Sequence, residues 1–539
     1  MKTGKTVKVL LTAATAAGML AGCGSKTDTD TFRFASELDI QGMDSTVVDD
    51  GMSFNAIHAI TDGLTAVNEK GKTAPAIAKS WDVSDDGKTY TFHLRDAKWT
   101  NGDKVTANDF VYSWRKIIKD AGNYAYMLGS GGASVKNADA LMELGANATD
   151  EQMATLGVTA KDDKTLVVEL ENKVPYFTDL MAFPCYFPQN EKFVEKCGKN
   201  YGTKPEYTLS NGAYTMTKWI KGNKATFTKN DKYYDAKAVK TKNLEMFLVQ
   251  DPKTAAQNFD NGKVDYATIN STLVDKYKGK DTFTTFNEGY LFYLQLNFKN
   301  NTIANKNVRE ALAYAINRKD LCENVLKDGS MAATGFVPSQ LSKSPAGKDF
   351  RDDADKYVSY DQKKAQEYLD AAKKELGTDT ITIDLLYGTD ESPMDTMAEY
   401  LQGSFSKLKG LKVNMVATVK KDRIYNREAN GNFQVVCTRW GPDYADPTTY
   451  LNLATTDNSN NYGKYTNTKF DALMEQIQKE SDLTKRWDLM IQAEKVMMDD
   501  LAYIPVFEKG SAALKAKNVK GLVVVPVGTP YTFKYVKLK

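Results

Sequence analysis

The segment between residues 381 and 417 constrains the fold more than any other part of the sequence. It holds a strand-like run, ITIDLLY, then a helical pattern from about Met394 to Leu408, then a second strand-like run, KVNMVA. Strand, helix and strand in this order predict a βαβ unit, whose two strands lie parallel and are joined by a right-handed crossover. The chain is therefore expected to belong to the α/β class.

Elsewhere, strand and helix patterns alternate irregularly. In TYTFHLR (89–95), Tyr90, Phe92 and Leu94 fall on one face, as in a half-buried strand, and TLVVEL (165–170) predicts a further strand. The chain has 539 residues, whereas a single core stops growing at roughly 250–300 residues. The expected architecture is α/β with mixed sheets, divided over more than one lobe.

Two helices are predicted together with their caps. The run TANDFVYSWRKII predicts a helix after Thr106, with Asp109 three residues on, as in a capping box. Residues 305–326 place apolar side chains on one helix face, and Asn307 with Glu310 resembles a second capping box.

The N-terminus has the pattern of a secretory signal peptide. Three lysines precede an apolar stretch from Val9 to Leu20, which is too short to span a bilayer as a helix. The sequence LAGC ends at Cys23 and resembles the lipobox of bacterial lipoproteins, in which cleavage leaves the cysteine as the lipid-bearing first residue. An ordinary signal peptide with a chance cysteine is the alternative.

The lipobox leads to an expected location. Residues 1–22 would be the signal peptide, and residues 23–31 a polar, flexible tether. The mature protein would be extracytoplasmic and anchored to the cell membrane only by a lipid such as palmitate on Cys23.

The charge balance argues against a dedicated nucleic-acid binder. The chain has 71 Lys and Arg against 69 Asp and Glu, and the two signs are interspersed, as on a solvated globular surface. A nucleic-acid-binding domain would show a clustered basic excess.

The usual signatures of enzymes are missing. With only His58 and His93, a histidine-based metal site or catalytic triad is poorly supplied. No GKT is preceded by the glycine that a phosphate-binding loop needs, and no G-x-S-x-G elbow occurs. We therefore expect a protein that is not an enzyme and needs no metal or cofactor.

Cys185 and Cys197 are the only close pair among the 5 cysteines. They could form a disulfide or remain thiols, and the sequence leaves both states open.

Six stretches carry a resemblance to a known family. They are GLTAVNEKGKTAPAIAKSWDVSDDGKTYTFHLRDAKWTNGDKVTANDFVYSWRKI (63–117), FPQNEKFVEKCGKNYG (187–202), LSNGAYTMTKW (209–219), DPKTAAQNFDNGKVDY (251–266), NVREALAYAINR (307–318) and WGPDYADPTTYL (440–451). Together they resemble the extracytoplasmic oligopeptide-binding proteins of peptide ABC importers, bacterial solute-binding protein family 5. The resemblance extends over nearly the whole mature chain.

The resemblance implies a two-lobed, periplasmic-binding-protein-like fold with a deep cleft, a hinge and an extra third domain. Peptide would lie between the lobes as an added β-strand, held by main-chain hydrogen bonds. Closure would be a hinge motion that the ligand stabilises. The implied division is residues 32–61, 188–288 and 508–539 for a discontinuous lobe I, residues 62–187 for the extra domain packed on it, and residues 289–507 for lobe II.

Asp443 matches the position at which peptide-binding relatives hold the peptide's α-ammonium. An ionised carboxylate suits this role because it accepts several charge-assisted hydrogen bonds. Pro442 would stiffen the loop, and Asp446 would act as a local cap before Pro447. Without the resemblance, Asp443 would be interpreted as a turn residue.

Other positions are carried over on the same ground. Trp440 is expected to line the cleft, and the main chain from Arg439 to Gly441 to pair with the ligand.

On the facing lobe, Asp49 falls where some relatives place an acid, and the main chain around Asp50 and Gly51 would pair with the peptide. Tyr124 and Tyr126 match an aromatic region near the ligand. Asp49 could equally be a solvated acid of a surface loop, and the two tyrosines could equally serve only in packing.

Two departures limit what carries over. Some relatives bind peptide carboxylates with an arginine at the position where this chain has Cys437. Relatives also have an aromatic residue roughly where this chain has Lys421. Preferred peptide length and sequence therefore do not transfer.

The expected function follows from the resemblance and the lipobox. The protein would be a monomeric, lipid-anchored binding protein that delivers oligopeptides to the transmembrane permease of an ABC importer. A signalling peptide, metal chelate, haem or sugar is the alternative cargo within the same family.

Overall fold

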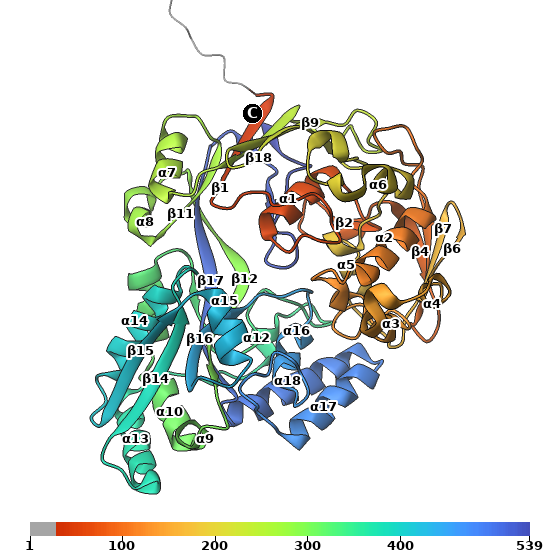
Figure 1. Ribbon diagram of the computed structural model, residues 1–539. Helices are drawn as coiled ribbons and strands as arrows, with labels where there is room; N and C mark the ends of the chain where they lie inside the picture. The colour runs from red at the N-terminus through yellow and green to blue at the C-terminus, as the bar shows by residue number, and fades with distance from the viewer. Residues whose placement is uncertain (1–28) are drawn as a thin grey trace, which may run out of the picture.

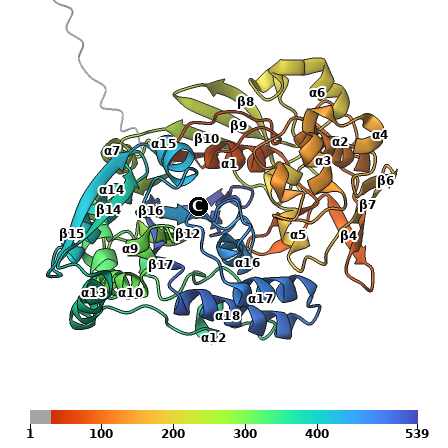
Figure 2. The same ribbon diagram turned by 60° about the horizontal axis from the view of Figure 1, so that its bottom comes forward.

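A computed structural model describes residues 29–539, and their fold is α/β with mixed sheets (Figures 1 and 2). The predicted signal peptide and Cys23 lie outside the described residues. No helix in the described part of the chain is long and apolar enough to cross a membrane. The first strand begins at Thr31, which pairs with Asn243, so the predicted tether overlaps the sheet by one residue.

One mixed sheet runs through the molecule. Its order is β15–β14–β16–β12–β17–β11–β1–β10–β9–β8, with β13 paired to β17. β14 and β15 are parallel, as are β1 and β10, whereas β12 is antiparallel to both β16 and β17. The strands are β1 Thr31–Ser36, β8 Tyr214–Ile220, β9 Lys224–Lys229, β10 Asn243–Leu248, β11 Tyr266–Ile269, β12 Phe283–Leu296, β13 Met331–Ala332, β14 Ile381–Gly388, β15 Leu411–Thr418, β16 Val435–Trp440 and β17 Tyr503–Lys515.

The predicted βαβ unit is confirmed in the lower lobe of Figure 1. Strand β14, helix α14 (Met394–Phe405) and strand β15 follow one another, and the two strands pair in parallel register over their whole length. The surrounding helices are α9 Asn301–Ala304, α10 Lys306–Ala315, α11 Arg318–Asp320, α12 Phe350–Asp353, α13 Gln362–Leu376, α15 Lys420–Asp422, α16 Thr448–Leu451, α17 Thr468–Lys479 and α18 Leu483–Asp499.

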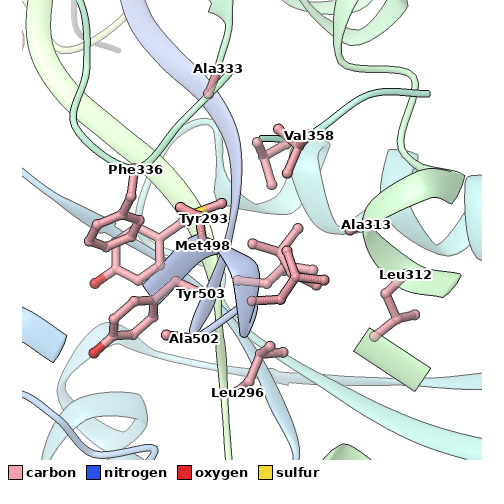
Figure 3. Packing of buried hydrophobic residues seen from close by; sticks show 14 of the residues in the cluster. Tyr293, Leu296, Leu312, Ala313, Ala333, Phe336, Val358, Met498, Ala502 and Tyr503 are labelled. Carbon is pink, nitrogen blue, oxygen red and sulfur yellow. The ribbon is translucent and has the colours of Figure 1, made fainter. Parts of the chain in front are cut away.

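The largest buried cluster draws its members from residues 291–507. At its centre, Phe336 packs on two tyrosines of neighbouring strands, with ring centroids 5.1 Å from Tyr293 and 4.7 Å from Tyr503 (Figure 3). The Tyr503 hydroxyl donates to the carbonyl of Leu453 at 2.6 Å, which satisfies the polar end of a buried ring.

A second cluster joins the N-terminal, middle and C-terminal segments of predicted lobe I. Phe34 of β1 stacks on Tyr266 of β11 and packs edge-on against Phe533 near the C-terminus. The remaining elements here are α1 Gly51–Ile60, α6 Glu191–Cys197, α7 Pro252–Asp260, α8 Ser271–Tyr277, β18 Val519–Lys520, β19 Val523–Val524, β20 Tyr531–Thr532 and β21 Lys537–Leu538.

The segment 62–187 forms its own sheet and core, drawn at the right of Figure 1. The four strands lie antiparallel in the order β4–β5–β7–β6, and β5 buries Tyr90, Phe92 and Leu94 as predicted. Its elements are β2 Thr65–Val67, β3 Thr73–Pro75, β4 Ala78–Val83, β5 Thr89–Leu94, α2 Ala107–Lys119, α3 Ala138–Leu144, α4 Asp150–Met153, β6 Val158–Asp162, β7 Thr165–Glu169 and α5 Phe177–Leu180.

Two long strands cross between the predicted lobes. Strands β12 and β17 pair antiparallel, and their register shifts between Asn287 and Leu291. This irregularity lies at the predicted boundaries, near residues 288 and 508. Since irregular pairing is where a sheet bends most easily, the place suits the predicted hinge.

The two predicted caps have different outcomes. Thr106 and Asp109 form a capping box at the start of α2, as predicted. The second prediction is wrong, because Asn305, not Asn307, caps α10, and Asn307 donates to Glu375 instead.

The predicted helix over 305–326 is also interrupted. Helix α10 ends at Ala315, and a short helix and a π-helical turn follow. The Arg318 guanidinium donates to the carbonyls of Ala313 and Ile316 at 3.0 and 3.2 Å. It thereby satisfies carbonyls that a continuing helix would have used.

The 4 cysteines of the described part, at positions 185, 197, 322 and 437, are all free thiols. Cys185 and Cys197 therefore do not form the disulfide that the sequence left open.

Candidate ligand-binding cleft

Strand β16 has a main-chain edge without a partner. Along one side it pairs with β12 over its whole length, from Val435–Leu296 to Trp440–Leu291. On the other side, β14 pairs with it only at Val435 and Val436. From Cys437 onward this side has no strand partner in the described part of the chain, and such an edge can accept an added strand.

The chain leaves β16 in a loop, residues 441–447, which we call the anchor loop. At Gly441 a Cβ atom would come within 2.5 Å of the Tyr290 ring, so only glycine fits there. Asp446 accepts from Thr448 at 3.1 Å, as the predicted cap, and also forms a buried ion pair with Arg486 at 2.6 Å, which the sequence did not indicate. These contacts fix the loop on lobe II.

Asp443 stands on this loop without a counter-charge. Burial raises the pKa of its carboxyl to about 6, and a hydrogen bond from the Tyr126 hydroxyl offsets only part of that effect. No cation of residues 29–539 forms an ion pair with it. A carboxylate held away from water without a partner is costly, so an arrangement of this kind points to a cationic ligand group.

Asp443 opens onto a cleft with a volume of about 430 Å³. Residues of predicted lobe I, the predicted extra domain and predicted lobe II contribute to its wall. Eight of the nine residues predicted to contact ligand line it, namely Asp49, Gly51, Tyr124, Tyr126, Arg439, Trp440, Gly441 and Asp443. The structure thus brings together positions that lie hundreds of residues apart in the sequence.

The aromatic wall comes from the extra domain and α1. The Tyr124 ring packs edge-on against Phe54, with centroids 5.1 Å apart, and lies 5.8 Å from the Tyr126 ring. Tyr126 is 40% exposed and lines the cleft. Asp49 lies at the rim and accepts a hydrogen bond from Asn123 at 2.7 Å.

Asp50 differs from the other predicted residues. Its side chain accepts from the Ser53 N–H at 2.8 Å and caps α1; it is not part of the cleft wall. Its predicted ligand contact was through the main chain, and that stays a prediction.

A buried cluster of charges at the lobe II end was not predicted. Arg423 donates to Glu391 at 2.8 Å, to Thr438 at 2.9 Å, and to Glu428. All of these side chains line the cleft. No local pattern marks this cluster, because its residues come from different elements.

Two further cations approach this cluster. The Arg439 Nε and Lys420 Nζ lie 3.6 and 3.9 Å from Glu391 Oε1, yet that buried oxygen has no hydrogen-bond partner among the described residues. With them, this cluster has three cations, Arg423, Arg439 and Lys420, against two anions, Glu391 and Glu428. Lys420, the neighbour of the departure noted at Lys421, lines the cleft, whereas Cys437 is buried in the core.

The Trp440 indole shows a second open polar group. Its Nε1 is buried and donates to no residue of the described chain. Since buried polar groups are normally hydrogen-bonded, a ligand or water acceptor is expected there.

A second hollow of about 660 Å³ adjoins the cleft and shares Gly51, Glu288 and Pro530 with it. Its wall combines Glu37 and Lys509 of predicted lobe I with Asp395 of predicted lobe II. Residues 29–539 contain no group of His, Cys, Asp and Glu that could hold a metal ion.

Comparison with known proteins agrees with this geometry. The family model for bacterial extracellular solute-binding proteins, family 5 (middle region), matches residues 72–462. The chain belongs to this family.

Several family 5 relatives match over most of their length. The dipeptide-binding protein of Lactococcus lactis subsp. cremoris is 34% identical over 561 residues, with 100% of both chains covered. The oligopeptide-binding protein OppA of Bacillus subtilis is 32% identical over 503 residues, which cover 90% of this chain and 88% of that protein. Among solved structures, Listeria monocytogenes OppA bound to peptide has a TM-score of 0.78 and 33% identity, and the match covers 95% and 99% of the two chains.

Proposed function

We propose that the protein captures oligopeptides outside the cell and delivers them to the permease of an ABC importer. The observation that carries this proposal is Asp443, a carboxylate in the cleft with no cationic partner in the described chain. The α-ammonium of a peptide supplies the missing charge, and the charge-assisted hydrogen bonds are strongest where water is excluded.

The open edge of β16 supports a peptide as the cargo. Main-chain N–H and C=O groups beyond Val436 can pair with an extended ligand backbone, whatever its side chains. A sugar or haem offers no matching ladder of amide groups. The main chain near Asp50 and Gly51 is proposed to hold the ligand from the other side.

The distribution of charge supports a zwitterionic ligand. Asp443 provides the negative end, and the cation excess around Lys420 and Arg439 provides the positive end. A peptide with free termini carries the complementary charges.

Lipid anchoring and the remaining predicted features belong to the same proposal. The LAGC sequence supports acylation of Cys23, and the absence of a spanning helix in residues 29–539 is compatible with a lipid as the anchor. We further propose that the molecule acts as a monomer, closes by a hinge at β12 and β17, and keeps the predicted division into lobes and extra domain.

Calorimetry with one peptide in free and N-acetylated forms tests the central claim. Asp443→Ala should weaken binding of the free peptide by roughly 2–5 kcal/mol, because the bound ammonium loses its partner, or about 30-fold to several thousand-fold. The acetylated peptide should bind the wild type poorly and be nearly insensitive to the substitution.

The control is a melting curve for each protein, since a loop substitution should leave the core intact. Equal affinity of wild type and Asp443→Ala for the free peptide would return Asp443 to the role of a turn residue. Native mass spectrometry of protein purified from its own cell should show co-purified peptides, whereas a co-purified sugar, haem or metal chelate would favour the alternative cargo.

A further inference from the structure

The anchor loop of lobe II contacts the extra domain directly. Tyr444, the neighbour of Asp443, stacks on Tyr176 with ring centroids 4.3 Å apart and planes 1° from parallel. Tyr444 is 4% exposed, and it alone of predicted lobe II belongs to the buried cluster of the extra domain. In Figures 1 and 2, α5, which follows Tyr176, and α16, which follows the anchor loop, mark this meeting point.

Two more contacts cross the same boundary. The Tyr126 hydroxyl of the extra domain is the hydrogen-bond donor of Asp443. The Lys173 ammonium donates to the carbonyl of Ser481 at 3.3 Å. The ammonium site is therefore assembled from two parts of the chain, with the carboxylate on lobe II and its donor on the extra domain.

The extra domain itself is fixed to lobe I. Phe54 of α1 packs against Phe183 with centroids 5.1 Å apart, and Lys116 of α2 pairs with Asp44 at 2.9 Å. Lobe II reaches lobe I through β12 and β17. A rotation at these two strands would therefore separate Tyr444 from Tyr176 and Asp443 from Tyr126 together.

We propose that the extra domain completes the ammonium site when the lobes close, and that Tyr176 is the positioning residue that sets Asp443 through Tyr444. This inference rests on the proposed role of Asp443 in peptide binding. Tyr176 does not touch the ligand; it fixes the neighbour of the residue that does. The stack and the Tyr126 hydrogen bond hold the anchor loop from one side, and the Asp446–Arg486 ion pair holds it from the other.

The geometry accounts for the choice of a tyrosine pair. Two rings in parallel contact define the position of the loop more tightly than flexible side chains would, because rings have few rotatable bonds. If the Asp443 carboxylate moves by about 1 Å from its place beside the ligand's ammonium, it loses much of its contribution to binding. Tyr176 would thus raise the affinity for peptide by keeping the Asp443 carboxylate in position.

The test combines substitutions at Tyr176 with Asp443→Ala in a double-mutant cycle. Tyr176→Leu removes the stack and should weaken binding of a peptide with a free N-terminus by roughly 2- to 12-fold, the usual range for an aromatic pair. Tyr176→Phe keeps the ring but loses the hydrogen bonds of the Tyr176 hydroxyl with Tyr444 and Thr448, and should retain most of the wild-type affinity. In the Asp443→Ala background, Tyr176→Leu should change affinity by less than about 2-fold, because the effect passes through Asp443.

A matched control lies in the same domain. Tyr112 is half-buried on α2 and faces a different groove, beside Arg115 and Glu191, so Tyr112→Leu should leave affinity unchanged. If Tyr176→Leu does not fold, as judged by its melting curve, Tyr444→Leu breaks the same stack from lobe II and takes its place in the cycle.

Every outcome bears on the inference. Wild-type affinity in Tyr176→Leu would overturn it, and so would an equal loss in both backgrounds, which would indicate a general effect on the lobes. If Asp443→Ala itself binds normally, the proposed function fails first. If Asp443→Ala is impaired while Tyr176→Leu is not, only the role of the extra domain is refuted.

Discussion

We expect ionised Asp443 to lower the free energy of unfolding of the ligand-free protein, and Asp443→Asn to raise it again. Burial raises the pKa of this carboxyl from 3.8 to about 6. Each pKa unit corresponds to about 1.4 kcal/mol, so ionised Asp443 destabilises the folded state by up to roughly 3 kcal/mol. Because the side chain is partly solvated, we expect Asn to gain about 1–3 kcal/mol at pH 8.

The pH dependence identifies the cause. A carboxyl whose folded-state pKa is raised destabilises the fold when it is ionised, and this cost disappears as the group takes up a proton. The stability gap between Asp443→Asn and the wild type should therefore be widest above about pH 6 and close as the pH falls towards 4. Packing differences between Asp and Asn would not follow that curve.

The assay is urea unfolding of protein freed of ligand by denaturation and refolding, at pH 8 and pH 4. Asp85→Asn, an exposed loop carboxylate, is the control and should change stability little. With saturating peptide the order should reverse, because only the wild type gains the ammonium contact. An Asn variant no more stable than the wild type at pH 8, or a gap that persists at pH 4, would refute the reasoning.

The remaining predictions concern anchoring, closure and charge. Cys23→Ser should abolish incorporation of radiolabelled lipid, because the lipid bonds to that thiol; incorporation that survives would exclude this anchor. A peptide mixture should reduce the radius of gyration measured by small-angle scattering, and an unchanged value with binding shown independently would argue against a hinge. Affinity for peptides with a free N-terminus should fall about tenfold per pH unit below pH 6, where Asp443 becomes protonated, and N-acetylated peptides should lack this dependence. Replacing both Lys420 and Arg439 by Met should weaken binding of peptides with a free C-terminus more than binding of amidated peptides. Equal losses would contradict the proposal that these two cations, which lie beside Glu391, hold the peptide's carboxylate.

Local patterns in the sequence predicted local structure well. The βαβ unit at 381–417, the half-buried strand at 89–94 and the cap at Thr106 depend on residues near one another in the chain, and all are present. The helix over 305–326 was mispredicted, since Arg318 makes its decisive contact with the carbonyl of Pro505 at 2.8 Å as well as with its own turn. Apolar spacing contains no information about such a partner.

The site shows the same limit more clearly. Asp443 looks like a turn residue by itself, and only the resemblance singled it out. What makes it a candidate binding residue is that it lines one cleft with Tyr126, Gly51 and Asp49, which depends on how three parts of the chain come together. The buried Arg423, Glu391 and Glu428 were missed for the same reason, because each alone is an ordinary charged residue.

A site divided in this way has a physical consequence for binding. In the proposed hinge motion, separation of the lobes lets water reach Asp443 and relieves part of the cost of its charge. Closure removes water from the carboxylate, and no cation of the described chain compensates for that loss. The closed form is therefore favourable only when a ligand brings a positive charge, so the unpaired acid that destabilises the empty cleft also makes closure depend on the cargo.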